Sequence, residues 1–99
     1  MQKAVIFNAS DNVATSLADL RAGEEVEINI GDRKVLTTLI RAVPFGHKFS
    51  LKDIVSGSPV IKYGEVIGLA TTDIKPGDYV HVHNVASARG RGDLARGEK

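Results

Sequence analysis

The chain of 99 residues contains no cysteine and no tryptophan. Without cysteine it can form neither a disulfide framework nor a thiolate metal site. No apolar run approaches the roughly 20 residues that a membrane-spanning helix needs, and the N-terminus lacks a signal-peptide pattern, so we expect a cytoplasmic protein without a membrane partner. A net charge of +1 gives no electrostatic case for a nucleic-acid partner.

Several common enzyme motifs are also missing from the sequence. There is no phosphate-binding loop of the GxxxxGK type, no dinucleotide fingerprint and no HExxH pair. No serine stands in a nucleophile elbow. A single domain of this length has a thin core and seldom encloses a cleft by itself. We therefore interpret the chain as one component of something larger.

The first part of the chain, residues 3–23, predicts a strand followed by a helix. Residues 4–7 form a short apolar run of strand type. Ser10 or Asp11 would cap the helix, and Gly23 would end it. The helix would present three apolar side chains on one face: Val13, Leu17 and Leu20.

The rest of the chain predicts short strands. Residues 24–40 alternate between apolar and polar side chains around a Gly31-Asp32 turn, which indicates a hairpin. Residues 41–84 contain β-prone pieces that glycines interrupt, and one helical turn is expected at residues 50–54. The expected fold is therefore mainly β with one main helix and short, glycine-broken strands.

We place this domain at residues 1–85 and find no internal repeat. Residues 86–99 are polar, rich in glycine and without periodicity, which is typical of a flexible C-terminal tail or linker. Arg89 and Arg91 lie in this segment without aromatic residues between them. We interpret them as part of a solvated tail rather than as an RNA-binding motif.

The three histidines are the first candidates for chemistry: His47, His81 and His83. On a strand, His81 and His83 would project to one face while Val82 points to the core. Two such imidazoles can share a divalent metal or bind a carboxylate, although a metal needs further ligands. The alternative is an exposed or purely structural pair. Asn84 could hydrogen-bond a hydroxyl group or cap the strand end.

Two further candidates carry open alternatives. His47 follows Gly46, so it is either a hydrogen-bonded loop residue or a residue close to a ligand. Lys62 and Tyr63 should point to opposite faces of a strand, so at most one of them serves a common site. Otherwise Lys62 is solvated and Tyr63 packs.

Several motifs occur together in register over residues 4–84: Asp11-Asn12-Val13-Ala14 with Leu17-Ala18-Asp19-Leu20, Gly46-His47-Lys48-Phe49-Ser50-Leu51, Ile61-Lys62-Tyr63-Gly64 followed by Ile67-Gly68, Asp73-Ile74 followed by Gly77, and His81-Val82-His83-Asn84. This pattern resembles the N-terminal domain of the altronate and galactarate dehydratase family, and also the small subunit of sulfolactate sulfo-lyase. The resemblance implies an SAF-type β-clip fold. The matches at residues 12–14 and 17–20 favour the sugar-acid branch.

The family resemblance implies a lyase that acts on a 2-hydroxy acid. Such enzymes remove the C2 proton and a group from C3, which is water in the dehydratases and sulfite in the sulfo-lyase, to give a 2-keto acid. The reaction needs a general acid and a stabilised enediolate. The resemblance therefore implies a divalent metal, Fe²⁺, held mainly by a partner subunit. It also implies that a large catalytic region is a separate partner chain or has been cut away, and the end at Arg96-Gly97-Glu98-Lys99 favours a separate small subunit.

Under this resemblance, residue roles can be assigned as expectations. His47, His81 and His83 line the face that meets the large subunit, and one of them donates a proton. His81 and His83 help to hold the metal. Lys62 pairs with the carboxylate of the sugar-acid substrate, and Asn84 contacts the substrate. The alternatives are a sulfo-lyase small subunit and a non-catalytic module that binds a sugar acid or assembles an oligomer, including a homo-oligomer.

Overall fold

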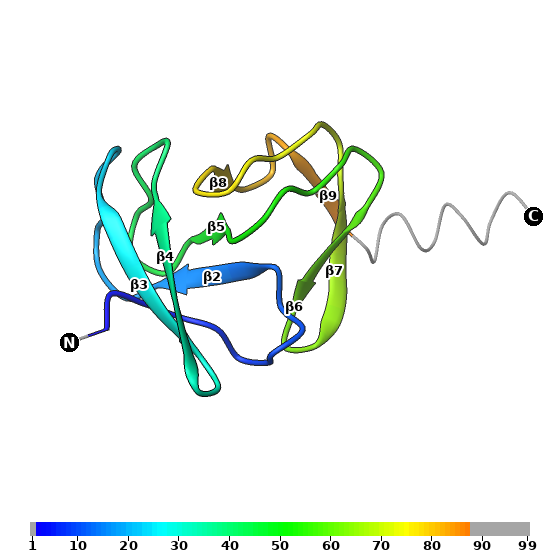
Figure 1. Cartoon of the computed structure of the whole chain (residues 1–99). Helices are drawn as coiled ribbons and strands as arrows, with labels where there is room; N and C mark the ends of the chain where they lie inside the picture. The colour runs from blue at the N-terminus through cyan, green and yellow to red at the C-terminus, as the bar shows by residue number, and fades with distance from the viewer. Residues whose placement is uncertain (1, 88–99) are drawn as a thin grey trace, which may run out of the picture.

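The computed structural model describes residues 2–87, which fold into β-strands and turns (Figure 1). The strands are β1 (Ala4–Val5), β2 (Val13–Ser16), β3 (Glu25–Ile30), β4 (Arg33–Thr38), β5 (Lys48–Ser50), β6 (Pro59–Lys62), β7 (Glu65–Ala70), β8 (Tyr79–Val80) and β9 (Val85–Ser87). The described range holds no helix, and so none that could cross a membrane. Strand β9 continues two residues past the predicted boundary at residue 85, whereas residues 88–99 of the predicted tail, with Arg89 and Arg91, lie outside the described residues.

All strand pairs are antiparallel, and they form three sheets. A four-stranded sheet has the order β1-β2-β5-β8, a two-stranded sheet pairs β3 with β4, and a three-stranded sheet has the order β6-β7-β9. Figure 1 shows the β3-β4 and β6-β7 hairpins at opposite ends of the four-stranded sheet. The predicted hairpin at residues 24–40 is confirmed, with Val26 and Ile28 buried and the alternating Glu25 and Glu27 exposed.

The predicted main helix is wrong. Val13, expected on its apolar face, lies in β2 opposite Ser50, and Leu17 is 45% exposed. Gly23 has a φ of +84°, which suits the end of a helix, but here it occupies a reverse turn. The expected helical turn at residues 50–54 is also wrong, because Ser50 ends strand β5. Capping residues and positive-φ glycines serve turns as well as helices, so these local signals were ambiguous.

One eight-residue turn unit occurs four times, at residues 19–26, 42–49, 53–60 and 73–80. In each unit the second and eighth residues are apolar and buried, and the fifth is a glycine with φ between +84° and +89°. The N–H of the sixth residue donates to the C=O of the third at 2.8–3.1 Å. With positive φ confined to the glycine, this is a type II turn. The expectation of no internal repeat is therefore wrong; the units share few side chains, which hides them in the sequence.

The four units form two pairs, and the pairs divide the domain into similar halves. The second residues of each pair form antiparallel bridges: Leu20 with Val43, and Ile54 with Ile74. In the first pair, Asp19 Oδ1 accepts a hydrogen bond from the Phe45 N–H at 2.9 Å, and in the second, Asp73 Oδ1 accepts one from the Ser56 N–H at 2.8 Å. Each pair encloses one hairpin, β3-β4 or β6-β7. The domain thus repeats one supersecondary structure twice.

Each half has its own apolar core. The first core consists of Ala4, Ala14, Leu20, Val26, Ile28, Leu39, Val43 and Phe49. The second consists of Val13, Ile54, Val60, Ala70, Ile74 and Val80. Backbone hydrogen bonds at Gly77 join the halves, since its N–H donates to Ser50 and its C=O accepts from Ile40. The four-stranded sheet takes strands from both halves and positions the candidate site.

Candidate functional site

The three predicted histidines lie together around a tyrosine that the prediction did not include. Strand β8 pairs with β5, so Tyr79 lies directly opposite Phe49, and His47 and His81 lie beside this pair. We call His47, Tyr79, His81 and His83 the histidine cluster. The His47 and His81 rings stack with centroids 5.0 Å apart and planes 20° apart. The Tyr79 ring centroid lies 5.6 Å, 5.4 Å and 5.6 Å from those of His47, His81 and His83, respectively.

One short hydrogen bond fixes the orientation of His47. Its Nδ1 lies 2.6 Å from the Tyr79 hydroxyl, and both side chains are half-buried. When the hydroxyl donates to Nδ1, neutral His47 carries its proton on Nε2. The histidine then presents an N–H donor on the side away from Tyr79. Only the position of Tyr79, two residues before His81 in a β-prone run, could have drawn attention to it in the sequence.

The predicted strand through His81, Val82 and His83 is wrong. Strand β8 ends at Val80, and residues 81–84 form a bend and turn. Val82, which the prediction placed in the core, is 81% exposed. His81 is half-buried and His83 is exposed, so the two rings do not share one face of a strand. The bend brings His81 back over His47 and Tyr79.

Asn84 holds this turn together. Its side chain is only 2% exposed; Oδ1 accepts a hydrogen bond from the His81 N–H at 2.9 Å, and Nδ2 donates to the Tyr79 C=O at 2.8 Å. The amide thus closes the turn after β8, in line with the strand-end cap that we considered for it. Contact between Asn84 and a substrate stays a prediction.

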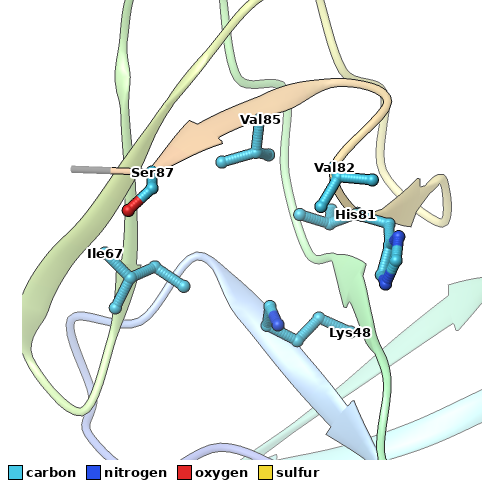
Figure 2. Close-up of a pocket in the computed structure, with 7 residues that line it drawn as sticks. Lys48, Ile67, His81, Val82, Val85 and Ser87 are labelled. Carbon is cyan, nitrogen blue, oxygen red and sulfur yellow. The ribbon is translucent and has the colours of Figure 1, made fainter. Parts of the chain in front are cut away.

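A cleft of about 230 Å³ lies beside the histidine cluster (Figure 2). It is lined by Lys48, Ile67, Val80, His81, Val82, Val85 and Ser87. In Figure 2 the Lys48 side chain extends from β5 between Ile67 and His81. Burial lowers the pKa of Lys48 from its usual value, and the nearby positive charge of Lys62 lowers it further. The sequence analysis missed Lys48, because its burial depends on strands distant in sequence.

Lys62 lies over an exposed aromatic pair. Its ammonium nitrogen is 5.0 Å from the centroid of the Tyr63 ring and 5.5 Å from that of Phe7, and these two rings stack at 4.4 Å. Tyr63 and Gly64 have φ values of +60° and +73°, which define a type I′ hairpin turn. The expectation that Lys62 and Tyr63 point to opposite faces is therefore wrong, because Tyr63 belongs to the turn. Lys62 does not contact the histidine cluster in any hydrogen bond or ring contact of residues 2–87.

The described residues do not form a metal site by themselves. Between residues 2 and 87, no three His, Cys, Asp or Glu side chains lie close enough together to hold a metal ion. The lone pairs of imidazole lie in the ring plane, so the nearly parallel His47 and His81 rings do not converge on one ion. A contribution of His81 and His83 to metal binding stays a prediction that requires ligands from another chain.

Comparison with known proteins gives consistent matches. Residues 2–88 match the family model described as altronate/galactarate dehydratase SAF domain. The chain is 49% identical over 78 residues to altronate dehydratase of Escherichia coli (strain K12), an alignment that covers 79% of this chain and 15% of that protein. It is 33% identical over 88 residues to (2R)-sulfolactate sulfo-lyase subunit alpha of Chromohalobacter salexigens, covering 86% of this chain and 94% of that one. Altronate dehydratase of Bacillus subtilis (strain 168) is 33% identical over 84 residues, with coverage of 85% and 16%.

Proposed function

Because this chain belongs to the altronate/galactarate dehydratase SAF domain family, we propose that it is the small component of a sugar-acid dehydratase and acts with a larger catalytic chain. The match covers only 15% and 16% of two altronate dehydratases, so most of such an enzyme lies outside the matched region. A relative matched over 94% of its length is named a subunit alpha, which supports an arrangement in separate chains. The identity of 49% to an altronate dehydratase supports a sugar acid as substrate.

The proposed reaction is the dehydration of a 2,3-dihydroxy acid. A base removes the C2 proton, the C3–O bond breaks, and a general acid protonates the departing oxygen so that water leaves. The enol then tautomerises to a 2-keto-3-deoxy acid, with no net oxidation or reduction. The divalent metal expected for this family, Fe²⁺, would be held mainly by the larger chain, since the described residues do not fit a metal ion.

In this proposal the histidine cluster faces the catalytic chain and supplies the proton for the leaving hydroxyl. The observation that carries the proposal is the convergence of three imidazoles and a phenol at one edge of the sheet, next to a cleft with a half-buried lysine. The bond between the Tyr79 hydroxyl and His47 Nδ1 holds this ring in place, so that its Nε2 faces away from Tyr79. An assembly module would need neither this bond nor stacked imidazoles.

A second candidate is a small subunit of a sulfolactate sulfo-lyase. Its support is the match over 94% of a subunit alpha of such an enzyme. In that case sulfite would leave from C3 in place of water. The histidine cluster would again face a larger catalytic chain.

The test is reconstitution of activity. The chain is mixed with a large dehydratase chain encoded in a neighbouring reading frame, with Fe²⁺ under anaerobic conditions, and 2-keto acid is measured after addition of altronate, galactarate or sulfolactate. We expect a sugar acid to react only when both chains are present. Full activity of the large chain without this chain would contradict the proposal. If sulfolactate is the one substrate of the three that reacts, the second candidate is selected.

A further inference from the structure

The cleft contains a positive charge that no described residue balances. The ion pairs of residues 2–87 are Lys3–Glu24, Lys34–Glu27, Arg41–Asp78 and Lys75–Asp53, and none includes Lys48 or Lys62. Lys48 is half-buried, and a charge removed from water without a partner is unfavourable. A structural lysine would gain more by lying in solvent. Lys48 thus leaves a partly desolvated positive charge in the cleft that is available to an anion.

The surroundings of Lys48 are complementary to an anion. Thr15 lies directly opposite Lys48 in the register of β2 and β5, so their side chains project from the same face of the sheet. The Thr15 hydroxyl oxygen is buried and has no hydrogen-bond partner among residues 2–87. The next residue across the sheet from Lys48 is Val80, and His81 lies at the rim. The described lining of the cleft therefore offers an ammonium group and includes no carboxylate.

From this geometry we propose that Lys48 anchors a carboxylate ligand in the cleft. The apolar walls, which include Ile67, Val80 and Val85, lower the local dielectric constant and so strengthen an ion pair with the ammonium group. The identity of the ligand rests on the proposed function. The carboxylate belongs either to the sugar acid or to an Asp or Glu side chain of the larger chain.

The proposal implies an unusual pH dependence. Only the charged form of Lys48 binds a carboxylate, and its lowered pKa means that it loses this charge at a lower pH than an ordinary lysine. Affinity should therefore fall as the pH rises through that value. Among residues 2–87, the other titratable groups near Lys48 are Lys62 and His81, and neither carries a negative charge that would repel an anion.

The first part of the test uses the full chain and a small carboxylate. Amide NMR spectra are recorded during titration with galactarate and, as a neutral control, with galactitol. If the ligand is the sugar acid, galactarate but not galactitol shifts the amides of Val82, Val85 and Ser87, and Lys48→Met weakens binding at least tenfold. Lys48→Arg, which keeps the charge, retains binding. The matched control Lys52→Met, at an exposed loop position, changes nothing.

The second part measures assembly with the larger chain by calorimetry. If the carboxylate belongs to that chain, Lys48→Met weakens assembly about tenfold, Lys48→Arg restores it and Lys52→Met has no effect. If Lys48→Met changes neither galactarate binding nor assembly while its amide spectrum remains that of a folded chain, the proposal is overturned. Should Lys48→Met fail to fold, the proposal is overturned equally by two results together: galactarate shifts in the wild-type chain that leave the cleft untouched, and wild-type assembly that weakens at high pH no more than assembly of Lys48→Arg. If the larger chain never binds, the proposed function is refuted. The galactarate titration would still decide whether Lys48 binds a carboxylate.

Discussion

Replacement of Gly77 by alanine should destabilise the domain far more than the same change at Gly57. Both glycines are the fifth residue of a turn unit, with φ of +86° and +89°. They differ in their surroundings. A Cβ atom on Gly57 would meet nothing within 4 Å, whereas a Cβ on Gly77 would lie 2.1 Å from the carbonyl oxygen of Thr38. The pair therefore separates the cost of backbone strain from the cost of a steric overlap.

The magnitude follows from these two contributions. An L-residue at positive φ costs about 1–2 kcal/mol, which is the whole effect expected for Gly57→Ala. Overpacking adds about 1–3 kcal/mol at Gly77, because the atom it meets belongs to the backbone and cannot rotate away. Gly77 also joins the two halves through hydrogen bonds to Ser50 and Ile40. We expect Gly77→Ala to cost about 2–5 kcal/mol in total, a large share of the roughly 5–15 kcal/mol typical of a domain.

The assay is thermal and urea unfolding of both variants beside the wild type. For a domain of this size about 1 kcal/mol corresponds to roughly 4–8 °C in Tm, so Gly77→Ala should unfold at least about 5 °C below Gly57→Ala. Its lower Tm should be accompanied by weaker protection of the Ile40 and Gly77 amides from hydrogen exchange. Equal losses of stability for the two variants would refute the close contact between Gly77 and Thr38 at the end of β4. The junction of the two halves depends on this contact.

Three further changes test other parts of the structure. Tyr79→Phe removes the 2.6 Å bond to His47 Nδ1 and should cost about 0.5–1.5 kcal/mol in urea unfolding; the ¹⁵N shift of His47 Nδ1 should move to that of a nitrogen without this partner, and an unchanged Nδ1 shift would contradict the bond. Asp19→Ala and Asp73→Ala each remove one bond to an equivalent turn, so each should cost about 1 kcal/mol and the double variant should cost the sum; unequal losses would argue against the repeat. The Lys3 ammonium, followed by the Arg21 N–H, lowers the pKa of Glu24, so this carboxylate contributes stability above its usual pKa that is lost as the pH falls through the lowered value. Lys3→Met should raise the pKa of Glu24 in a ¹³C NMR titration, whereas Lys34→Met should leave the pKa of Glu24 unchanged.

The sequence predicted those parts of the fold that depend on neighbouring residues. The alternation around Gly31 and Asp32 is local, and the hairpin formed as expected. The helix was wrong because the apolar partner of Leu20 is Val43, and no local pattern reveals that bridge. The four turn units had a readable signal, an apolar residue three positions before a glycine and another three positions after it. That spacing is common enough in proteins that only the backbone geometry makes it decisive.

The candidate site was predicted in part. Residue type and position drew attention to His47, His81 and His83, and the family resemblance added their roles; the structure brings their rings together, although not on a strand. Tyr79 and Lys48 were missed because their roles arise from cross-strand pairing between β5 and β8, which lie about thirty residues apart in the chain. Burial, rather than residue type, distinguishes Lys48 from the solvated lysines.

The central claim is that the histidine cluster takes part in the reaction of an assembled lyase. The most direct measurement is the turnover of 2-keto acid by the larger chain combined with the triple variant His47→Ala/His81→Ala/His83→Ala, with assembly affinity measured in parallel and Lys52→Met as the matched control. We predict that the triple variant assembles like the wild type but that kcat falls by about 100-fold or more, the usual contribution of a general acid. An unchanged kcat in a fully assembled enzyme would contradict the account and leave this domain a role in assembly alone.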